Sequence, residues 1–170
     1  MGKEMFFIGT LHLGLTNIGE LLSLIKGFDP KLILVEIVDK DIASNNLSSY
    51  PVEMVEVLKF ARFNNLDVKG FDVKIDVINK DLSNEDILKI SNEQVDFIRN
   101  YSWKDFNKTE LLKELNSISH NLFDKKNWDL RQSKMKKNID KFSKDKRCVV
   151  ICGASHIPFF KNEFEKAKFL

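Results

Sequence analysis

The sequence predicts an α/β protein built on a mostly parallel sheet covered by helices. Two observations support this class. First, four short apolar runs are bounded by turn-forming or polar residues, which is the pattern of strands buried on both faces. Second, amphipathic helical patterns lie between the first three runs, and strand–helix–strand alternation over the first 72 residues is typical of right-handed βαβ units.

The predicted strands are the four apolar runs, each followed directly by a glycine or an acidic residue. They span 5–8, 32–35, 68–71 and 148–152, and the residues that follow are Gly9, Glu36, Asp72 and Gly153. The last run carries Cys148 and Cys152. An extended strand separates these two cysteines by about 13 Å, which is too far for a disulfide, so we expect two buried thiols.

Helical patterns fill the gaps between the first three strands. Apolar residues at helical spacing cover 18–25, with Thr16 as the expected N-cap and Gly27 as the expected end. A second stripe covers 54–61 and opens at Pro51, since proline is tolerated in the first turn of a helix.

Residues 80–143 contain helical patterns and no strand-like run, so we expect a helical insert before the last core strand. Capping signals are expected at 91–94 and 107–110. Apolar stripes at helical spacing then cover 112–122 and 128–142.

The length of 170 residues suits a single domain. We expect its α/β core to comprise 1–79 and 144–170, with the helical insert over 80–143 between them. A last amphipathic helix is expected after Pro158.

Composition argues against several classes of partner. Lys and Arg number 27 against 25 Asp and Glu, and the net charge of +2 gives no electrostatic case for binding nucleic acid. We interpret the basic run over 134–147 as a solvated helix face. No run approaches the ~20 apolar residues of a membrane-spanning helix, and no secretory signal pattern is present. We therefore expect a cytoplasmic protein without a membrane partner.

The predicted strand ends carry the candidate functional residues. Ligands of parallel α/β sheets bind beyond the carboxyl ends of the strands. In this sequence those ends are followed by His12, Glu36, Asp72 and His156, so that every predicted strand delivers a functional polar side chain to one edge. We therefore expect the site at that edge.

The two histidines suggest a metal site. His12 and His156 each lie three residues after a glycine, in turns that look alike. Two imidazoles and one carboxylate form a facial ligand set for a divalent ion, and Glu36 is the expected carboxylate. We expect Mn, Co, Zn or Fe. The alternatives are that each histidine caps or packs at a strand end and that Glu36 forms a salt bridge with a neighbouring lysine or arginine.

Arg131 and Asp72 complete the candidate site. The spacing of Arg131 from Trp128 and Met135 places the guanidinium on the apolar face of its helix, where it needs a carboxylate or an anionic ligand, unless it extends to the surface. Asp72 either orients an imidazole or caps a turn.

Several of these residues lie in motifs that resemble those of the TraB/GumN/TIKI family. The run Ile8-Gly9-Thr10-Leu11-His12 is similar to the family's Gly-Thr-x-His motif, and Gly153-Ala154-Ser155-His156 is similar to its late Gly-x-x-His. Glu36 matches the glutamate that ends the family's second strand. The segment from Trp128 to Met135 resembles its Arg-Asn-x-x-Met helix, with Gln132 in place of the usual Asn.

The resemblance implies an α/β core in which both Gly-x-x-His turns and the glutamate face one cleft. It also implies a range of activities, because the family and its relatives include metal-dependent proteases, proteins that shut down a peptide pheromone, erythromycin esterases and haem-uptake ChaN-like proteins.

We therefore expect a divalent-metal-dependent hydrolase of a peptide or small acyl substrate. His12 and His156 would hold the ion, and Glu36 would be a third ligand or the general base. Arg131 would neutralise an oxyanion or a substrate carboxylate, and Asp72 would orient a histidine. Two alternatives use the same cleft: a metal-free esterase based on a histidine and Glu36, and a module that binds a peptide or haem without turnover.

Overall fold

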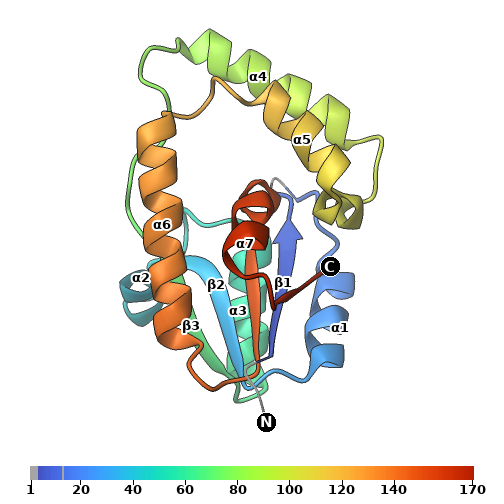
Figure 1. Ribbon diagram of the computed structural model, residues 1–170, viewed down its shortest axis with the longest axis vertical. Coiled ribbons are helices and arrows are strands. Elements are labelled where there is room, and N and C mark those ends of the chain that lie inside the picture. The colour runs from blue at the N-terminus through green and yellow to red at the C-terminus, as the bar shows by residue number, and fades with distance from the viewer. Residues whose placement is uncertain (1–3, 13) are drawn as a thin grey trace.

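The computed structural model describes residues 4–12 and 14–170, and within them five parallel strands form one sheet (Figure 1). The strand order is β3-β2-β4-β1-β5, so the last long strand lies between the first two. The predicted α/β class is confirmed. The strands are β1 (Met5–Thr10), β2 (Leu32–Val38), β3 (Asp67–Asp72), β4 (Cys148–Gly153) and β5 (Lys168–Phe169).

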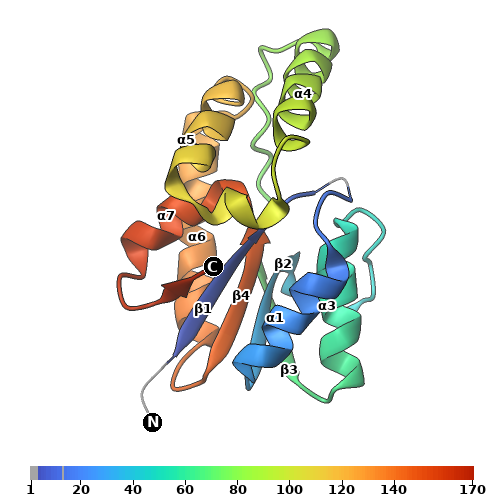
Figure 2. The ribbon, with the colours of Figure 1, turned by 90° about the vertical axis from the view of Figure 1, so that its right-hand side faces the viewer.

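Helices cover both faces of the sheet. Figure 2 shows α1 and α3 on one face and α6 and α7 on the other, with α4 and α5 beyond the edge where β1 and β4 end. The helices are α1 (Ile18–Phe28), α2 (Asp39–Ala43), α3 (Val52–Phe63), α4 (Asn84–Ile98), α5 (Thr109–Ile118), α6 (Lys125–Phe142) and α7 (Ile157–Glu163), and the 3-10 turns are η1 (Trp103–Asn107) and η2 (Ala154–His156).

The core is densest around the central strands. β4 is buried throughout and β2 nearly so, as expected for strands covered on both faces. Cys148 and Cys152 are both buried on β4 and form no disulfide with each other. Phe7 on β1 packs against the rings of Phe160 and Phe169, with centroid distances of 5.3 and 4.9 Å. Phe7 and Phe160 are fully buried, so these rings fill part of the core.

The ends predicted for the first helix are wrong by one or two residues. The N-cap of α1 is Asn17, not Thr16. Thr16 instead closes the preceding loop, because its hydroxyl accepts the Leu11 N–H at 2.8 Å and donates to the Leu11 carbonyl at 2.7 Å. The helix passes Gly27 and ends at Phe28, and its C-cap, Asp29, adopts the left-handed conformation.

The helical region before β4 is confirmed, but both capping signals predicted in it are wrong. Ser83 caps α4 through a reciprocal capping box with Asp86, so 91–94 lie inside that helix. Asn107 is buried in η1 and does not cap α5. The apolar stripe over 128–142 lies in α6, which packs against the sheet and so belongs to one of the covering layers.

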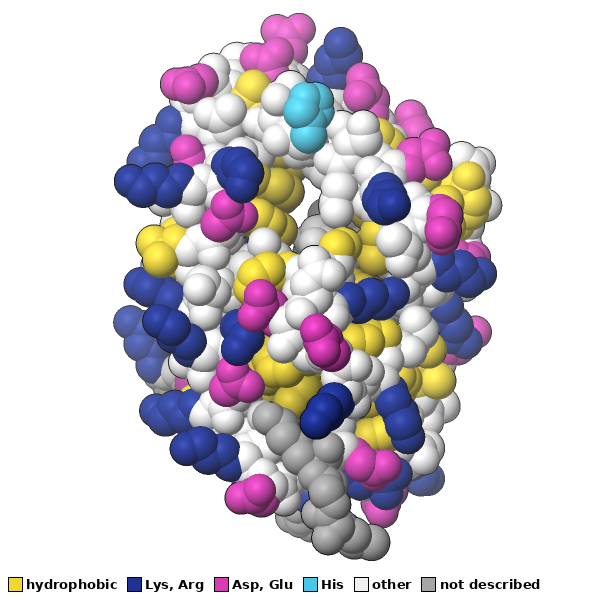
Figure 3. All heavy atoms as spheres, viewed as in Figure 1, with side chains coloured by type: hydrophobic (Ala, Val, Ile, Leu, Met, Phe, Trp, Pro, Cys, Tyr) yellow, Lys and Arg dark blue, Asp and Glu magenta, His cyan; other side chains and the backbone are white. Residues whose placement is uncertain are grey.

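The surface mixes both signs of charge. On the face shown in Figure 3, Lys and Arg side chains gather along the edge formed by α6, and acidic side chains are interspersed over the rest. Six of the seven basic residues in 134–147 are exposed and the seventh is half-buried; four lie on α6 and three follow it, so the run is solvated but only its first part is a helix face. Within the described ranges, no helix combines the length and apolarity needed to cross a bilayer.

Candidate functional site

The carboxyl ends of β1, β2, β3 and β4 meet at one edge of the sheet and bring the predicted site residues together. His12 lies in the loop after β1, Glu36 in the last part of β2, Asp72 at the end of β3 and His156 in η2 after β4. Arg131 reaches the same edge from α6.

Glu36 lies at the centre of this arrangement. It is 7% exposed. The β2–β4 pairing ends at Val35, and the next side chain, Glu36, accepts the Gly153 N–H at 2.6 Å through Oε2. Its other oxygen, Oε1, lies 2.9 Å from Arg131 Nη2 and 3.2 Å from His156 Nε2. The carboxylate thus joins β2 to β4 and α6.

Arg131 is held by two carboxylates. Its Nε and Nη2 donate to Asp72 Oδ1 and Oδ2 at 2.9 and 2.7 Å, a bidentate pair, and Nη2 also donates to Glu36. The prediction that a guanidinium on this helix face needs a carboxylate is confirmed. Asp72 also accepts the Val73 N–H at 2.7 Å, so in the described residues it pairs with the arginine and the turn and contacts no imidazole.

The charges in this cluster stabilise one another. Burial by itself raises the pKa of the Glu36 carboxyl, but His156 and Arg131 outweigh it and hold that pKa well below its usual range. Burial likewise opposes the charge of Arg131, and the hydrogen bond to Asp72 together with Glu36 raises its pKa above the ordinary value. Glu36 and Arg131 are therefore an ionised, buried pair.

His156 is 1% exposed and is fixed on every side. Nε2 faces Glu36, and Nδ1 lies 3.3 Å from Gln132 Oε1. The Trp128 ring stacks on the imidazole, with centroids 4.5 Å apart and an angle of 10° between the planes. Gln132 stands where the motif that this helix resembles has an asparagine, and its side chain contacts His156 directly.

His12 is in a different environment, so the two histidine turns are not alike. Its side chain is 43% exposed, and Nδ1 lies 2.6 Å from Glu53 Oε1. Glu53 lies in the first turn of α3 and is 1% exposed. Because an ionised carboxylate only accepts hydrogen bonds, Nδ1 carries the proton, and Nε2 points to the side of Gly153.

The electrostatic surroundings of His12 favour its charged form. Burial lowers the pKa of the imidazole, but the hydrogen bond to Glu53 and the negative charge of Glu36 outweigh it and raise the pKa above the ordinary 6.5. A raised pKa makes the imidazole a stronger base, which favours proton uptake by His12.

Gly153 allows His12 and Glu36 to approach β4 closely. A Cβ atom at this position would lie 3.1 Å from His12 Nε2 and 3.5 Å from Glu36 Oε2. Nε2 of His12 and Oε2 of Glu36 therefore converge on the space above the Gly153 backbone, which a side chain would fill.

Glu53 is the principal site residue that the sequence reasoning missed. It lies four residues before Val57, on the buried stripe of α3, where an acidic residue is unusual. An acidic residue on this apolar stripe was the sequence signal that could have identified Glu53. Asn107 was also missed as a site residue: it accepts the Gly9 N–H at 2.7 Å and donates to the Gly9 carbonyl at 3.0 Å, which fixes the end of β1.

The predicted metal ligands are engaged with one another and with protein partners. Both nitrogens of His156 and both oxygens of Glu36 have such partners. Across residues 4–12 and 14–170, no group of three or more His, Cys, Asp and Glu side chains has an arrangement that fits a metal ion. The side chains as placed therefore fit a three-ligand ion poorly, and the metal site stays a prediction.

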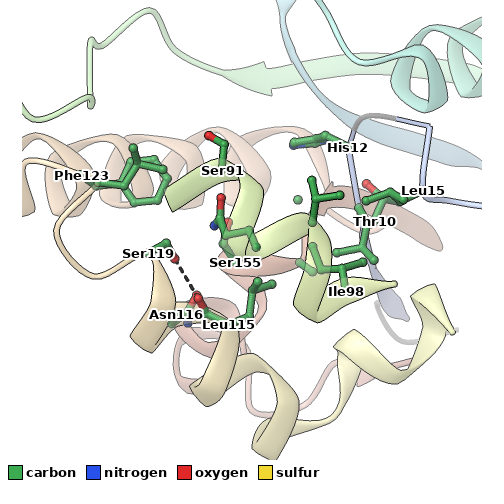
Figure 4. Close-up of a pocket in the computed structure, with 16 residues that line it drawn as sticks. Thr10, His12, Leu15, Ser91, Ile98, Leu115, Asn116, Ser119, Phe123 and Ser155 are labelled. Atoms are coloured by element: carbon green, nitrogen blue, oxygen red, sulfur yellow. Dashed lines mark hydrogen bonds between the residues drawn. The ribbon is translucent and has the colours of Figure 1, made fainter. Parts of the chain in front are cut away.

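A pocket of about 320 Å³ borders His12. Figure 4 shows His12 at its rim, with Thr10 from β1, Ile98 and Ser91 from α4, and side chains from α5 around it. Gly153, which faces Nε2 of His12, also lines it. The pocket therefore lies where a ligand would contact the reactive side of the imidazole.

Comparison of the chain with sequence models of protein families, with curated proteins and with solved structures gives no match. The fold and the site by themselves define the class: an α/β protein with an all-parallel sheet, whose strand ends carry a buried ionised cluster beside a carboxylate-held histidine.

Proposed function

We propose that this chain is a hydrolase of peptides or small acyl compounds and that His12 is its general base. The observation that carries the proposal is the 2.6 Å contact between His12 Nδ1 and Glu53 Oε1 beside the pocket. A carboxylate that accepts from Nδ1–H keeps the imidazole in the tautomer with a lone pair on Nε2. A general base needs that lone pair on its exposed side.

The proposed reaction balances with the chain's own groups. Nε2 of His12 removes a proton from water as the water oxygen forms a bond to the substrate carbonyl carbon. The same proton passes from Nε2 to the leaving oxygen or nitrogen as its bond to the carbonyl carbon breaks, and a carboxylic acid and an alcohol or amine are released. The carboxylates of Glu53 and Glu36 favour the intermediate imidazolium, since both raise the pKa of His12.

In this proposal the buried cluster positions the site. Nε and Nη2 of Arg131 are already bound by carboxylates, so the arginine suits holding Glu36 better than binding an oxyanion. Asp72 holds the arginine, and His156 packs against Glu36 from the other side. Glu36 then supplies fixed negative charge near Nε2 of His12.

The proposal is tested with p-nitrophenyl esters and an unlabelled peptide, in the presence of a strong chelator. We expect turnover that His12→Ala lowers by about 100-fold or more, the usual size of a general-base contribution. His120→Ala is the matched control, because His120 is an exposed histidine whose Nδ1 lies 2.8 Å from the Ser117 carbonyl. Equal rates in wild type and His12→Ala would remove His12 from the mechanism.

A metal-dependent hydrolase is a second proposal, favoured by one observation. Metal-ligating histidines are commonly held in the same way, with one ring nitrogen donating to a carboxylate and the other left for the ion; in His12 these are Nδ1, on Glu53, and Nε2, beside the pocket. Metal content of the purified protein tests it: about one Mn, Co, Zn or Fe per chain, lost in both His12→Ala and His156→Ala, supports the metal form. Metal-free protein with chelator-resistant turnover contradicts it.

A further inference from the structure

The pocket beside His12 offers almost nothing to neutralise a charged ligand. Among the described residues that line it, His12 alone carries an ionisable side chain. The pocket's aliphatic lining comes from the loop after β1 and from α4 and α5, with Leu15, Val95, Ile98 and Leu115 as main members. Burying a carboxylate or ammonium among such groups without a partner is costly.

Two of the hydroxyl groups in the pocket wall donate to backbone carbonyls of the protein. The Ser119 hydroxyl donates to the Leu115 carbonyl at 3.0 Å (Figure 4), and the Thr10 hydroxyl donates to the Cys152 carbonyl at 3.3 Å. These hydroxyls present less hydrogen-bonding capacity to a ligand than their residue types suggest. The surface that the pocket offers to a ligand is therefore more apolar than the residue types lining it suggest.

We infer that this pocket binds the uncharged aliphatic acyl chain of an ester or amide, which places the scissile carbonyl at His12; the inference rests on the proposed hydrolase function. A carboxylate or ammonium at the far end of the chain would meet no counter-charge and is rejected. Among esters and amides, the site therefore selects those whose acyl chain is aliphatic and carries no charge.

The size of the pocket limits the chain. Its 320 Å³ is near the lower end of ligand pockets, which are about 300–1,000 Å³. At about 30 Å³ for each water-sized group, it holds roughly ten such groups. An acyl chain of about six to eight carbons, with the reacting carbonyl and the attacking water, fills that space.

A series of p-nitrophenyl esters tests the inference. Each buried methylene is worth about a fourfold gain, so kcat/KM is expected to rise on the order of 100-fold from acetate to hexanoate. The adipate half-ester, which ends in a carboxylate at similar length, is expected to react at least about 10-fold more slowly than the hexanoate. Turnover of acetate with no gain at hexanoate would overturn the chain-binding role and leave the hydrolase proposal intact.

A charge placed in the pocket wall provides the reciprocal test. Gln94 lines the pocket from α4, whereas Asn92 on the same helix is exposed and outside it. Gln94→Lys is expected to raise the ratio of adipate half-ester to hexanoate turnover about 10-fold, because the ammonium pairs with the ligand carboxylate. Asn92→Lys, with the same change of net charge, is expected to leave the ratio unchanged. Equal ratios in both variants would contradict the inference.

A binding measurement keeps the inference testable if no ester is hydrolysed. Hexanamide titrated into methyl-labelled protein is expected to shift the NMR signals of Val95, Ile98 and Leu115, and adipic acid monoamide at equal concentration is expected not to. Shifts without turnover would overturn the hydrolase proposal and support the ligand class. Absence of shifts at these three residues would overturn the ligand class.

Discussion

Glu53 determines which ring nitrogen of His12 faces Gly153. Its Oε1 accepts from Nδ1, and its Oε2 has no hydrogen-bond partner among the described residues although it is buried. A buried carboxylate with one unpaired oxygen is costly unless something else requires it. Holding a base in the correct tautomer is such a requirement.

Glu53→Gln is expected to lower turnover by about 10- to 100-fold, the usual effect of losing a partner that orients an active histidine. Because Glu53 raises the pKa of His12, its loss lowers that pKa, and the acid limb of the pH–rate profile moves to lower pH. The His12 titration followed by NMR checks the shift independently. Glu56→Gln, one turn away and paired with Lys59, serves as control, and an unmoved His12 titration in Glu53→Gln would refute the role.

Gly153 is expected to tolerate no side chain without loss of activity, because His12 and Glu36 approach it closely. Gly153→Ala adds a methyl group 3.1 Å from His12 Nε2, and the half-exposed imidazole must shift away from β4 by a few tenths of an ångström. We expect near-native thermal stability with strongly reduced turnover. Gly27→Ala, where a Cβ has nothing within 4 Å, is expected to keep full activity and to gain roughly 0.5–1 kcal/mol of helix stability. Unchanged turnover in Gly153→Ala would show that activity does not require His12 to lie this close to residue 153.

At the scale of elements, Arg131 joins α6 to β2 and β3 through Glu36 and Asp72. The Arg131 side chain is only 16% exposed, so its removal leaves two buried carboxylates without their counter-charge. Arg131→Met is expected to lower the free energy of unfolding by about 3–5 kcal/mol. Urea denaturation measures this, with the exposed Arg99→Met as control; a loss below about 1 kcal/mol would mean that the cluster contributes little to holding α6.

Elements with a strong period were predictable, and their ends were not. Burial in or against the sheet requires apolar residues at the period of each element. This pattern is visible in the local sequence of β2, β4 and α6. The residue that caps a helix depends on which of several neighbouring polar side chains is free of other tertiary hydrogen bonds. Thr16 has the chemistry of an N-cap but is used by the Leu11 backbone, and Asn107 is used by Gly9 across 98 residues of sequence.

For the whole molecule, the sheet topology explains which site residues could be predicted. Parallel strands bring their carboxyl ends to one edge, so His12, Glu36, Asp72 and His156 were expected together from the strand ends alone. Glu53 comes from a helix on the face of the sheet, and no strand-end argument reaches it. The different environments of the two histidines could not be predicted from the strand ends either, because His156 is covered by Trp128, which comes from α6.

The charges of the site predict how stability depends on pH. The pKa of His12 is raised by folding, so its contribution is fully present below the ordinary value of 6.5 and is lost as pH rises through the higher folded value. The pKa of Glu36 is depressed, so its contribution is present above the ordinary 4.5 and is lost as pH falls toward the folded value. We therefore expect a stability maximum between these limits.

Urea denaturation from pH 4 to pH 9 measures this maximum. The decline on the alkaline side is expected to weaken in His12→Ala and in Glu53→Gln, because neither protein keeps an ionised glutamate paired with a titrating imidazole. The decline on the acid side is expected to persist in both variants, since Glu36, Arg131 and His156 are untouched. An alkaline decline of wild-type size in His12→Ala would show that the His12–Glu53 contact does not couple to folding.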